Sequence, residues 1–218
     1  RHAILWLALA TVLALPFVWP DVVVPSGASL DAAGSSEVTL VVPTLPAWVV
    51  PSLTAAWLTW VAFGLIRIGL GWHRLRALCR AAGPLPATLA DRVASWSALA
   101  PGRRPDVRVS HEIRGACAAG VPGPVILLSA DLVDALPPDA LGRIVLHEHA
   151  HLERGDHWGR LVQSLVEAVA GLHPAVAYLL RRIDLEREVA CDELVVARTR
   201  EARDYARSLI DAAAVDAR

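Results

Sequence analysis

The chain has 218 residues, of which 55% are hydrophobic, and its mean hydropathy is +0.43. This apolar content exceeds the roughly 45–50% that is typical of soluble domains, so it indicates segments that enter a membrane. The formal net charge of −1 gives the whole chain no bias toward nucleic acid, and we expect no direct nucleic-acid partner.

Two long stretches without charged residues, 3–20 and 47–66, lie in the N-terminal part of the chain. Each has about the 17–25 residues that a membrane-spanning helix needs. Tryptophans flank both stretches, as interfacial anchors do: Trp6, Trp19, Trp48 and Trp72. We therefore predict transmembrane helices over residues 1–20 and 47–72. The sequence contains no Met, so we also expect it to belong to a longer chain.

The charges around these stretches predict their orientation. Residues 21–46 carry acidic but no basic residues, whereas the chain after the second stretch is basic, with Arg67, Arg74, Arg76 and Arg80. The positive-inside rule then makes residues 21–46 an extracytoplasmic loop and residues 73–218 a cytoplasmic domain. The expected localisation is the cell membrane, with several passes and the lipid bilayer as a partner. The oligomeric state stays open.

The three cysteines are far apart and form no CxxC pair: Cys79, Cys117 and Cys191. A cysteine-based zinc site is therefore not expected. We expect buried free thiols in a reducing compartment.

Residues 73–218 predict one mainly helical α+β domain. Short strands rich in β-branched residues are expected at 107–110 and 125–129, and helices at 91–100, 139–152 and 175–198. The helix at 139–152 should start at Pro137-Pro138-Asp139, where proline is tolerated, and end before Gly155. The apolar residues 161–180 are expected to form a helix pair that breaks near Pro174 and lies against the membrane or the domain core.

Residues 147–157 read HEHAHLERGDH, and they lie at the end of the predicted helix 139–152. At helical spacing His147 and His151 share one face, so both imidazoles can reach one Zn²⁺ ion. Glu148 can then lie next to the metal as the general base. His149 should point away from His147, either outward or into a structural hydrogen bond.

A catalytic zinc site needs a third protein ligand and an open position. His157 has the spacing of the HExxHxxGxxH pattern, but Arg154 stands at the glycine position and the chain has no Met for the accompanying Met-turn. The alternative is Glu188 in EREVACDEL, with Asp192 one helical turn later to accept a hydrogen bond from a ligand histidine. These acids could also form a solvated face with nearby arginines, but the apolar flanks and the upstream motif favour Glu188 as the ligand.

These residues resemble the BlaR/MecR family of membrane metallopeptidases. The shared pattern is HExxH, then Arg154 and Asp156, then His173-Pro174, and then Glu188 with Asp192 on an Arg-rich helix. Residues 107–132 are similar to the edge-strand region of that family. The resemblance implies a zincin-like (gluzincin) domain after transmembrane helices, with zinc held by His147, His151 and Glu188, Glu148 as the catalytic residue, and Asp156 and Asp192 supporting the ligands.

The resemblance also implies a function. A membrane zinc metalloendopeptidase would cut a cytoplasmic protein, namely a transcriptional repressor, with autocleavage, in signal transduction that regulates antibiotic resistance. It further implies one span before the two predicted here and another after residue 218. Two alternatives are a quality-control protease of the HtpX/Ste type and a receptor whose peptidase domain only relays a signal.

Two features of the mechanism are predicted from the residues. The strand near residues 125–128 could hold an extended substrate by edge pairing. His173, Tyr178 and Tyr205 are candidates for a side chain that stabilises the oxyanion.

Overall fold

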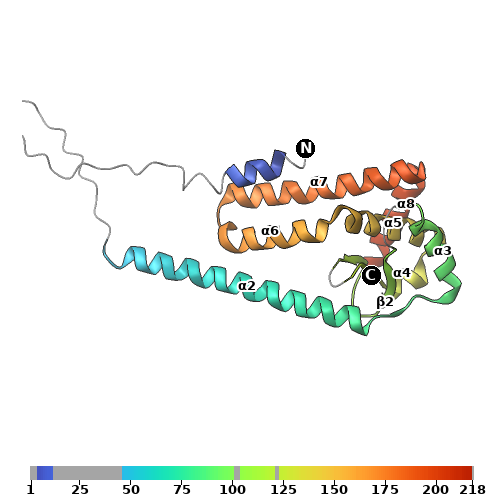
Figure 1. The fold of residues 1–218 in the computed structure, drawn as a ribbon, viewed down its shortest axis with the longest axis horizontal. Helices are drawn as coiled ribbons and strands as arrows, with labels where there is room; N and C mark the ends of the chain where they lie inside the picture. The colour runs from blue at the N-terminus through green and yellow to red at the C-terminus, as the bar shows by residue number, and fades with distance from the viewer. Residues whose placement is uncertain (1–3, 12–45, 101–103, 121–122, 218) are drawn as a thin grey trace, which may run out of the picture.

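The structure is mainly helical and contains one small sheet (Figure 1). It is a computed structural model that describes residues 4–11, 46–100, 104–120 and 123–217. Residues 4–11 are helical. The elements that follow are α2 (Val49–Ala81), β1 (Gly83–Pro84), α3 (Ala87–Ser97), β2 (Asp106–Ser110), β3 (Ala116–Ala119), β4 (Val125–Ser129), α4 (Ala130–Ala135), α5 (Pro138–Arg154), α6 (Asp156–Ala170), α7 (Pro174–Thr199) and α8 (Ala202–Asp216).

The sheet has the strand order β1-β2-β4-β3. β4 lies inside it, parallel to β2 on one side and antiparallel to β3 on the other. Its residues Ile126, Leu127 and Leu128 are fully buried, because helices and neighbouring strands enclose this apolar strand. Ile126 and Leu128 belong to a core cluster with Val93 of α3 and Leu141 of α5.

α5 begins and ends where the sequence predicts. Pro137 precedes it and Pro138 opens it, where proline's missing N–H costs no helical hydrogen bond. Gly155 ends it in the left-handed conformation with φ 71°, which glycine adopts without strain. The chain then reverses directly into α6, which places Asp156 beside the last turn of α5.

α2 is a 33-residue helix with no buried residues. Among the described residues it is the one helix long and apolar enough to cross a membrane. It continues nine residues past the predicted end at 72, to Ala81, because the arginines that follow favour helix and the first breaker is Gly83-Pro84.

α2 packs against α6 at a close approach. A Cβ on Gly64 would lie 2.6 Å from the Cβ of Ala168 on α6. About two turns before Gly64, the Trp57 indole N–H donates to the Val169 carbonyl at 2.9 Å. The C-terminal half of α6 therefore lies beside the middle of α2.

Several predicted boundaries need correction. α3 starts at Ala87, four residues before the predicted 91, because Pro86 in an extended conformation opens the helix and accepts from the next turn. Four elements were not predicted from the sequence, because each is short or lacks a clear apolar period: β1, β3, α4 and α8. The predicted break at Pro174 and the helix after it are confirmed by α6 and α7.

The first predicted span lies mostly outside the described residues, as does the loop 21–46 apart from its last residue. Of the span, residues 4–11 are described. Leu9 there is 1% exposed and packs with Val176, Leu180 and Ile183 of α7.

Candidate active site

Two imidazoles on α5 and one carboxylate on α7 converge. His147 and His151 are one turn apart, with ring centroids 4.9 Å apart at 86°. The Nε2 atoms of His147 and His151 lie 3.6 and 3.5 Å from Oε2 of Glu188. α7 crosses α5 so that the Glu188 carboxylate closes this group, although the two helices are separated in sequence by α6.

The donor set fits a zinc ion. One ligand atom from each of the three residues lies within 4.8 Å of the others. Zinc–nitrogen and zinc–oxygen bonds of about 2.1 Å in a tetrahedral site separate ligand atoms by about 3.4 Å. The separations of 3.5 and 3.6 Å from Glu188 are close to that value. Three protein ligands of this kind leave a fourth position for water or substrate.

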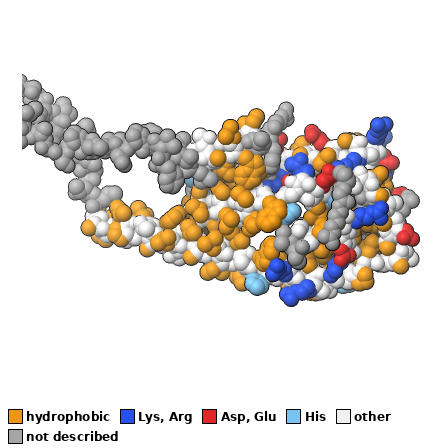
Figure 2. Space-filling view, viewed as in Figure 1, with side chains coloured by type: hydrophobic (Ala, Val, Ile, Leu, Met, Phe, Trp, Pro, Cys, Tyr) orange, Lys and Arg blue, Asp and Glu red, His pale blue; other side chains and the backbone are white. Residues whose placement is uncertain are grey.

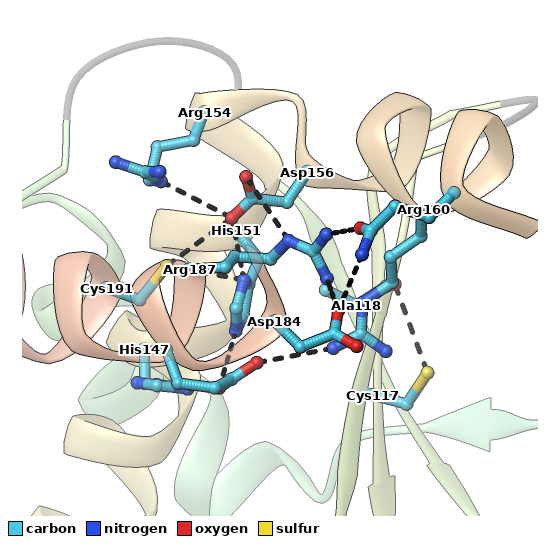
Figure 3. Close-up of polar contacts among 12 residues, drawn as sticks. Cys117, Ala118, His147, His151, Arg154, Asp156, Arg160, Asp184, Arg187 and Cys191 are labelled. Carbon is cyan, nitrogen blue, oxygen red and sulfur yellow. Dashed lines mark hydrogen bonds and ion pairs between the residues drawn. The ribbon is translucent and has the colours of Figure 1, made fainter. Parts of the chain in front are cut away.

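The other nitrogen of His151 is held by a buried acid. Its Nδ1 lies 2.9 Å from Oδ2 of Asp156 and 3.3 Å from Sγ of Cys191. Arg154 lies 3.4 Å from the same Asp156 oxygen, and Nε of the buried Arg187 lies 4.0 Å from Oδ1. Figure 3 shows these side chains converging from α5, α6 and α7.

The His151, Asp156 and Cys191 trio also has the residue types of a metal site. Two guanidinium groups lie beside Asp156, however, and positive charge there opposes a cation. The trio instead orients His151, so that Nδ1 donates to Asp156 and Nε2 faces Glu188.

The Nδ1 atom of His147 has its own partners. It lies 3.2 Å from Oδ1 of Asp192 on α7 and 2.7 Å from the hydroxyl of Tyr205 on α8. The Tyr205 hydroxyl in turn donates to Asp192 at 2.5 Å. Both histidines therefore have a carboxylate on the side away from Glu188.

The ionisation of the site follows from these contacts. Burial would lower the pKa of His151, but hydrogen bonds with Asp156, Cys191 and Glu188 raise it to about 11. Hydrogen bonds from His147 and His151 lower the pKa of Glu188. Burial alone would raise the pKa of the Asp156 carboxyl. The hydrogen bond with His151 and the positive charge of Arg154 outweigh burial, so the pKa of Asp156 is lowered overall.

Glu148 lines the same cavity, and its environment differs from that of Glu188. Burial raises the pKa of Glu148, although both neighbouring histidines oppose this effect. A carboxylate with a raised pKa accepts a proton more readily near neutral pH. The two glutamates therefore suit different chemistry, with Glu188 as an anionic ligand and Glu148 as a proton acceptor.

A cavity of about 530 Å³ opens over these residues. β3 forms one wall, with Cys117 and Ala118 among its lining residues, and the C-terminal part of α2 forms another. The remaining lining residues come from α5, α6 and α7 and include His157, Trp158, Arg160 and Ser164. An extended segment that enters this cavity would run between β3 and α5.

The prediction that residues 125–128 offer an edge to the substrate is wrong. Both sides of β4 are occupied, by β2 and by β3. β3 is an outer strand of the sheet and pairs only with β4 in the described part of the chain. The free edge beside the cavity therefore belongs to Ala116–Ala119.

The other histidine predictions have different outcomes. His149 does not face outward, because it is 2% exposed. His157 lines the cavity, but its ring packs on Gly120, where a Cβ would lie 2.5 Å away, and it is not in the group with His147, His151 and Glu188. His173 precedes α7 and is exposed.

The candidate oxyanion side chains are not brought to the cavity. His173 immediately precedes α7 and Tyr178 lies in its second turn. Glu188 lies about 15 to 22 Å further along that helix at 1.5 Å per residue. Tyr205 reaches the site, but on the Nδ1 side of His147. None of the three is among the residues that line the cavity.

Some residues of the site were not singled out from the sequence. Arg187 is one of the arginines near the acid pair that a solvated face would have exposed, yet it is 1% exposed and lies beside Asp156. Cys191 is a buried free thiol, as expected, but its contacts with His151 and Asp156 were not predicted. Their position on α7 within one turn of Glu188 was the available signal. Cys117 is exposed rather than buried.

A family model described as BlaR1 peptidase M56 matches residues 2–218, almost the entire chain. No curated protein matches the chain.

Proposed function

Since the chain belongs to the BlaR1 peptidase M56 family, we propose that it is a membrane-bound zinc metalloendopeptidase. One observation carries this proposal: His147, His151 and Glu188 present ligand atoms to one point, and Glu148 lines the same cavity. A signal relay alone would need neither the converging ligands nor an acid beside them.

The chain's own residues account for the proposed hydrolysis. A zinc ion bound by His147, His151 and Glu188 would supply Lewis acidity toward the scissile carbonyl and the attacking water. Glu148 would take a proton from that water and return it to the leaving amine. Asp156 and Asp192 would hold the two imidazoles in the tautomer that leaves Nε2 free. The edge of β3 would align an extended peptide across the cavity.

The exposed apolar surface supports membrane association. Figure 2 shows hydrophobic side chains gathered over α2 and the adjoining helices, while charged side chains are concentrated toward the other end of the molecule. Arginines at the end of α2 favour a cytoplasmic position for the residues that follow. We propose a cytoplasmic protein as the substrate, and a transcriptional repressor as its class, from the family resemblance.

The experiment compares the wild-type chain with Glu148→Gln, both purified in detergent. Bound zinc is measured by elemental analysis, and cleavage is followed with a labelled unfolded protein such as casein. We expect about one zinc per chain in both proteins and at least ~10²-fold less cleavage in Glu148→Gln. Glu193→Gln, at an exposed site on α7, is the matched control and should cleave normally. Equal cleavage by wild type and Glu148→Gln would refute the mechanism.

A further inference from the structure

Tyr205 is a buried residue at the site, and the proposed mechanism gives it no role. It is 3% exposed and belongs to a small core cluster with Leu146 of α5 and Val195 of α7. Its hydroxyl nevertheless ends between two polar groups, His147 and Asp192. The position of this tyrosine is therefore fixed by hydrogen bonds of its hydroxyl as well as by the apolar packing of its ring.

The geometry excludes a direct role of Tyr205 on a substrate. The hydroxyl lies 2.7 Å from Nδ1 of His147, whereas Glu188 faces Nε2 at 3.6 Å. These nitrogens are on opposite sides of the imidazole ring, and Tyr205 does not line the cavity. A group in this position can act on a reaction only through His147.

We propose that Tyr205 is a positioning residue, whose hydroxyl joins His147 to Asp192 and so sets the orientation of a zinc ligand. This inference rests on the proposed zinc site. A hydroxyl can accept from Nδ1–H of His147 and donate to Asp192 at the same time. The direct distance from His147 to Asp192 is 3.2 Å, longer than either contact with the hydroxyl.

The position of Tyr205 is itself fixed by the docking of α8 on α5. Arg143 of α5 binds Glu201, the residue before α8, at 2.7 Å. The same guanidinium reaches the Ser208 hydroxyl at 3.5 Å. Contacts on both sides of Tyr205 thus anchor α8 to α5, the helix that carries His147. Through Tyr205, the affinity of the site for zinc then depends on α8, although α8 supplies no metal ligand.

Tyr205→Phe tests the inference because it removes the hydroxyl and keeps the ring. Zinc affinity is measured by competition with a chromophoric chelator. Loss of a hydrogen-bond partner of a metal ligand typically weakens affinity by about 10–100-fold, and we expect a loss in that range. Tyr178→Phe is the matched control, since Tyr178 is the only other tyrosine and is 63% exposed. It should bind zinc as wild type does.

Two further measurements separate positioning from folding. The visible spectrum of the cobalt-substituted protein should change in Tyr205→Phe, because it reports ligand geometry. The double variant Tyr205→Phe/Asp192→Asn should lose less zinc-binding free energy than the sum of the losses in the two single variants. The reason is that the two groups act through the same contact. A lower unfolding temperature of the metal-free Tyr205→Phe with unchanged zinc affinity and cobalt spectrum would overturn the inference. Absence of zinc from the wild type would instead contradict the proposed function.

Discussion

The choice of the third metal ligand depends on the position of a few atoms. Glu188 places Oε2 3.5 to 3.6 Å from His147 and His151, whereas the His157 ring turns toward Gly120, the residue after β3. The direct reversal of the chain at Gly155 explains the difference. It puts Asp156 next to His151 and rotates the following residue toward the sheet.

Glu188→Gln should therefore lose zinc, while His157→Ala should keep it. An amide is a neutral and weaker ligand, so the loss should exceed the roughly 10–100-fold that follows removal of a ligand's hydrogen-bond partner. Zinc content after gel filtration gives the measurement. Loss of zinc from His157→Ala alone would show that the ligand assignment is wrong.

Arg187 is the residue whose environment differs most from what its type suggests. Its side chain is 1% exposed and contacts Asp184 at 2.8 Å and the Gln163 side chain, with Asp156 nearby. Removing one member of a buried charged group leaves the others without compensation.

We expect Arg187→Met to lower the free energy of unfolding by about 3–5 kcal/mol. The exposed Arg181 on the same helix provides the control. Arg181→Met should change the free energy of unfolding by less than about 0.5 kcal/mol. Urea unfolding in detergent, followed by circular dichroism, measures both. Similar losses in the two variants would contradict the role assigned to Arg187.

At the scale of elements, the packing of α2 on α6 completes the cavity. Gly64 allows the close approach to Ala168, and Ile68 and Trp72, further along α2, line the cavity. The same helix therefore contributes both a candidate membrane span and a wall of the site.

Gly64→Val should separate α2 from α6, because its side chain would overlap Ala168. Overpacking of this kind costs about 1–3 kcal/mol, and we expect a lower unfolding temperature and a higher KM. Gly69→Val is the control, since nothing lies within 4 Å of a Cβ at Gly69. An unchanged KM in Gly64→Val would show that the wall formed by α2 does not contribute to substrate binding.

At the scale of the whole molecule, apolar surface continues from α2 onto α6. Exposed residues of α6 repeat every three or four positions, which places them on one face: Trp158, Val162, Leu165 and Val169. The end of this face lies beside the middle of α2, as the Trp57–Val169 hydrogen bond shows. If α2 spans a bilayer, we expect this face of α6 to enter it and the candidate active site to lie near the membrane surface.

A lipid-confined quencher can test this arrangement in reconstituted vesicles. Single labelling sites are made as Leu165→Cys on α6 and Arg203→Cys on α8, with Cys79 and Cys117 replaced by serine. We expect strong quenching of a fluorophore at position 165 and weak quenching at position 203. Equal quenching at the two positions would contradict insertion of the α6 face.

Prediction from sequence succeeded where the signal is local. The ends of α5 follow from Pro138 and Gly155, and the pairing of His147 with His151 follows from the helical period. Glu188 and Asp192 were predicted as a pair for the same reason. The edge strand was assigned to the wrong residues, because Ala116–Ala119 has little β propensity and the apolar β4 resembles any buried strand.

The sequence by itself determined the composition of the site: a histidine pair with an acid between them on one helix, and a second acid pair on another. It also determined that α2 is long and apolar. Only the tertiary structure decided that Glu188 rather than His157 faces both histidines, that Tyr205 joins His147 to Asp192, and that Arg187 is buried. Residue spacing specifies which side chains share a face of one helix. Contacts between helices depend on how those faces pack across the core.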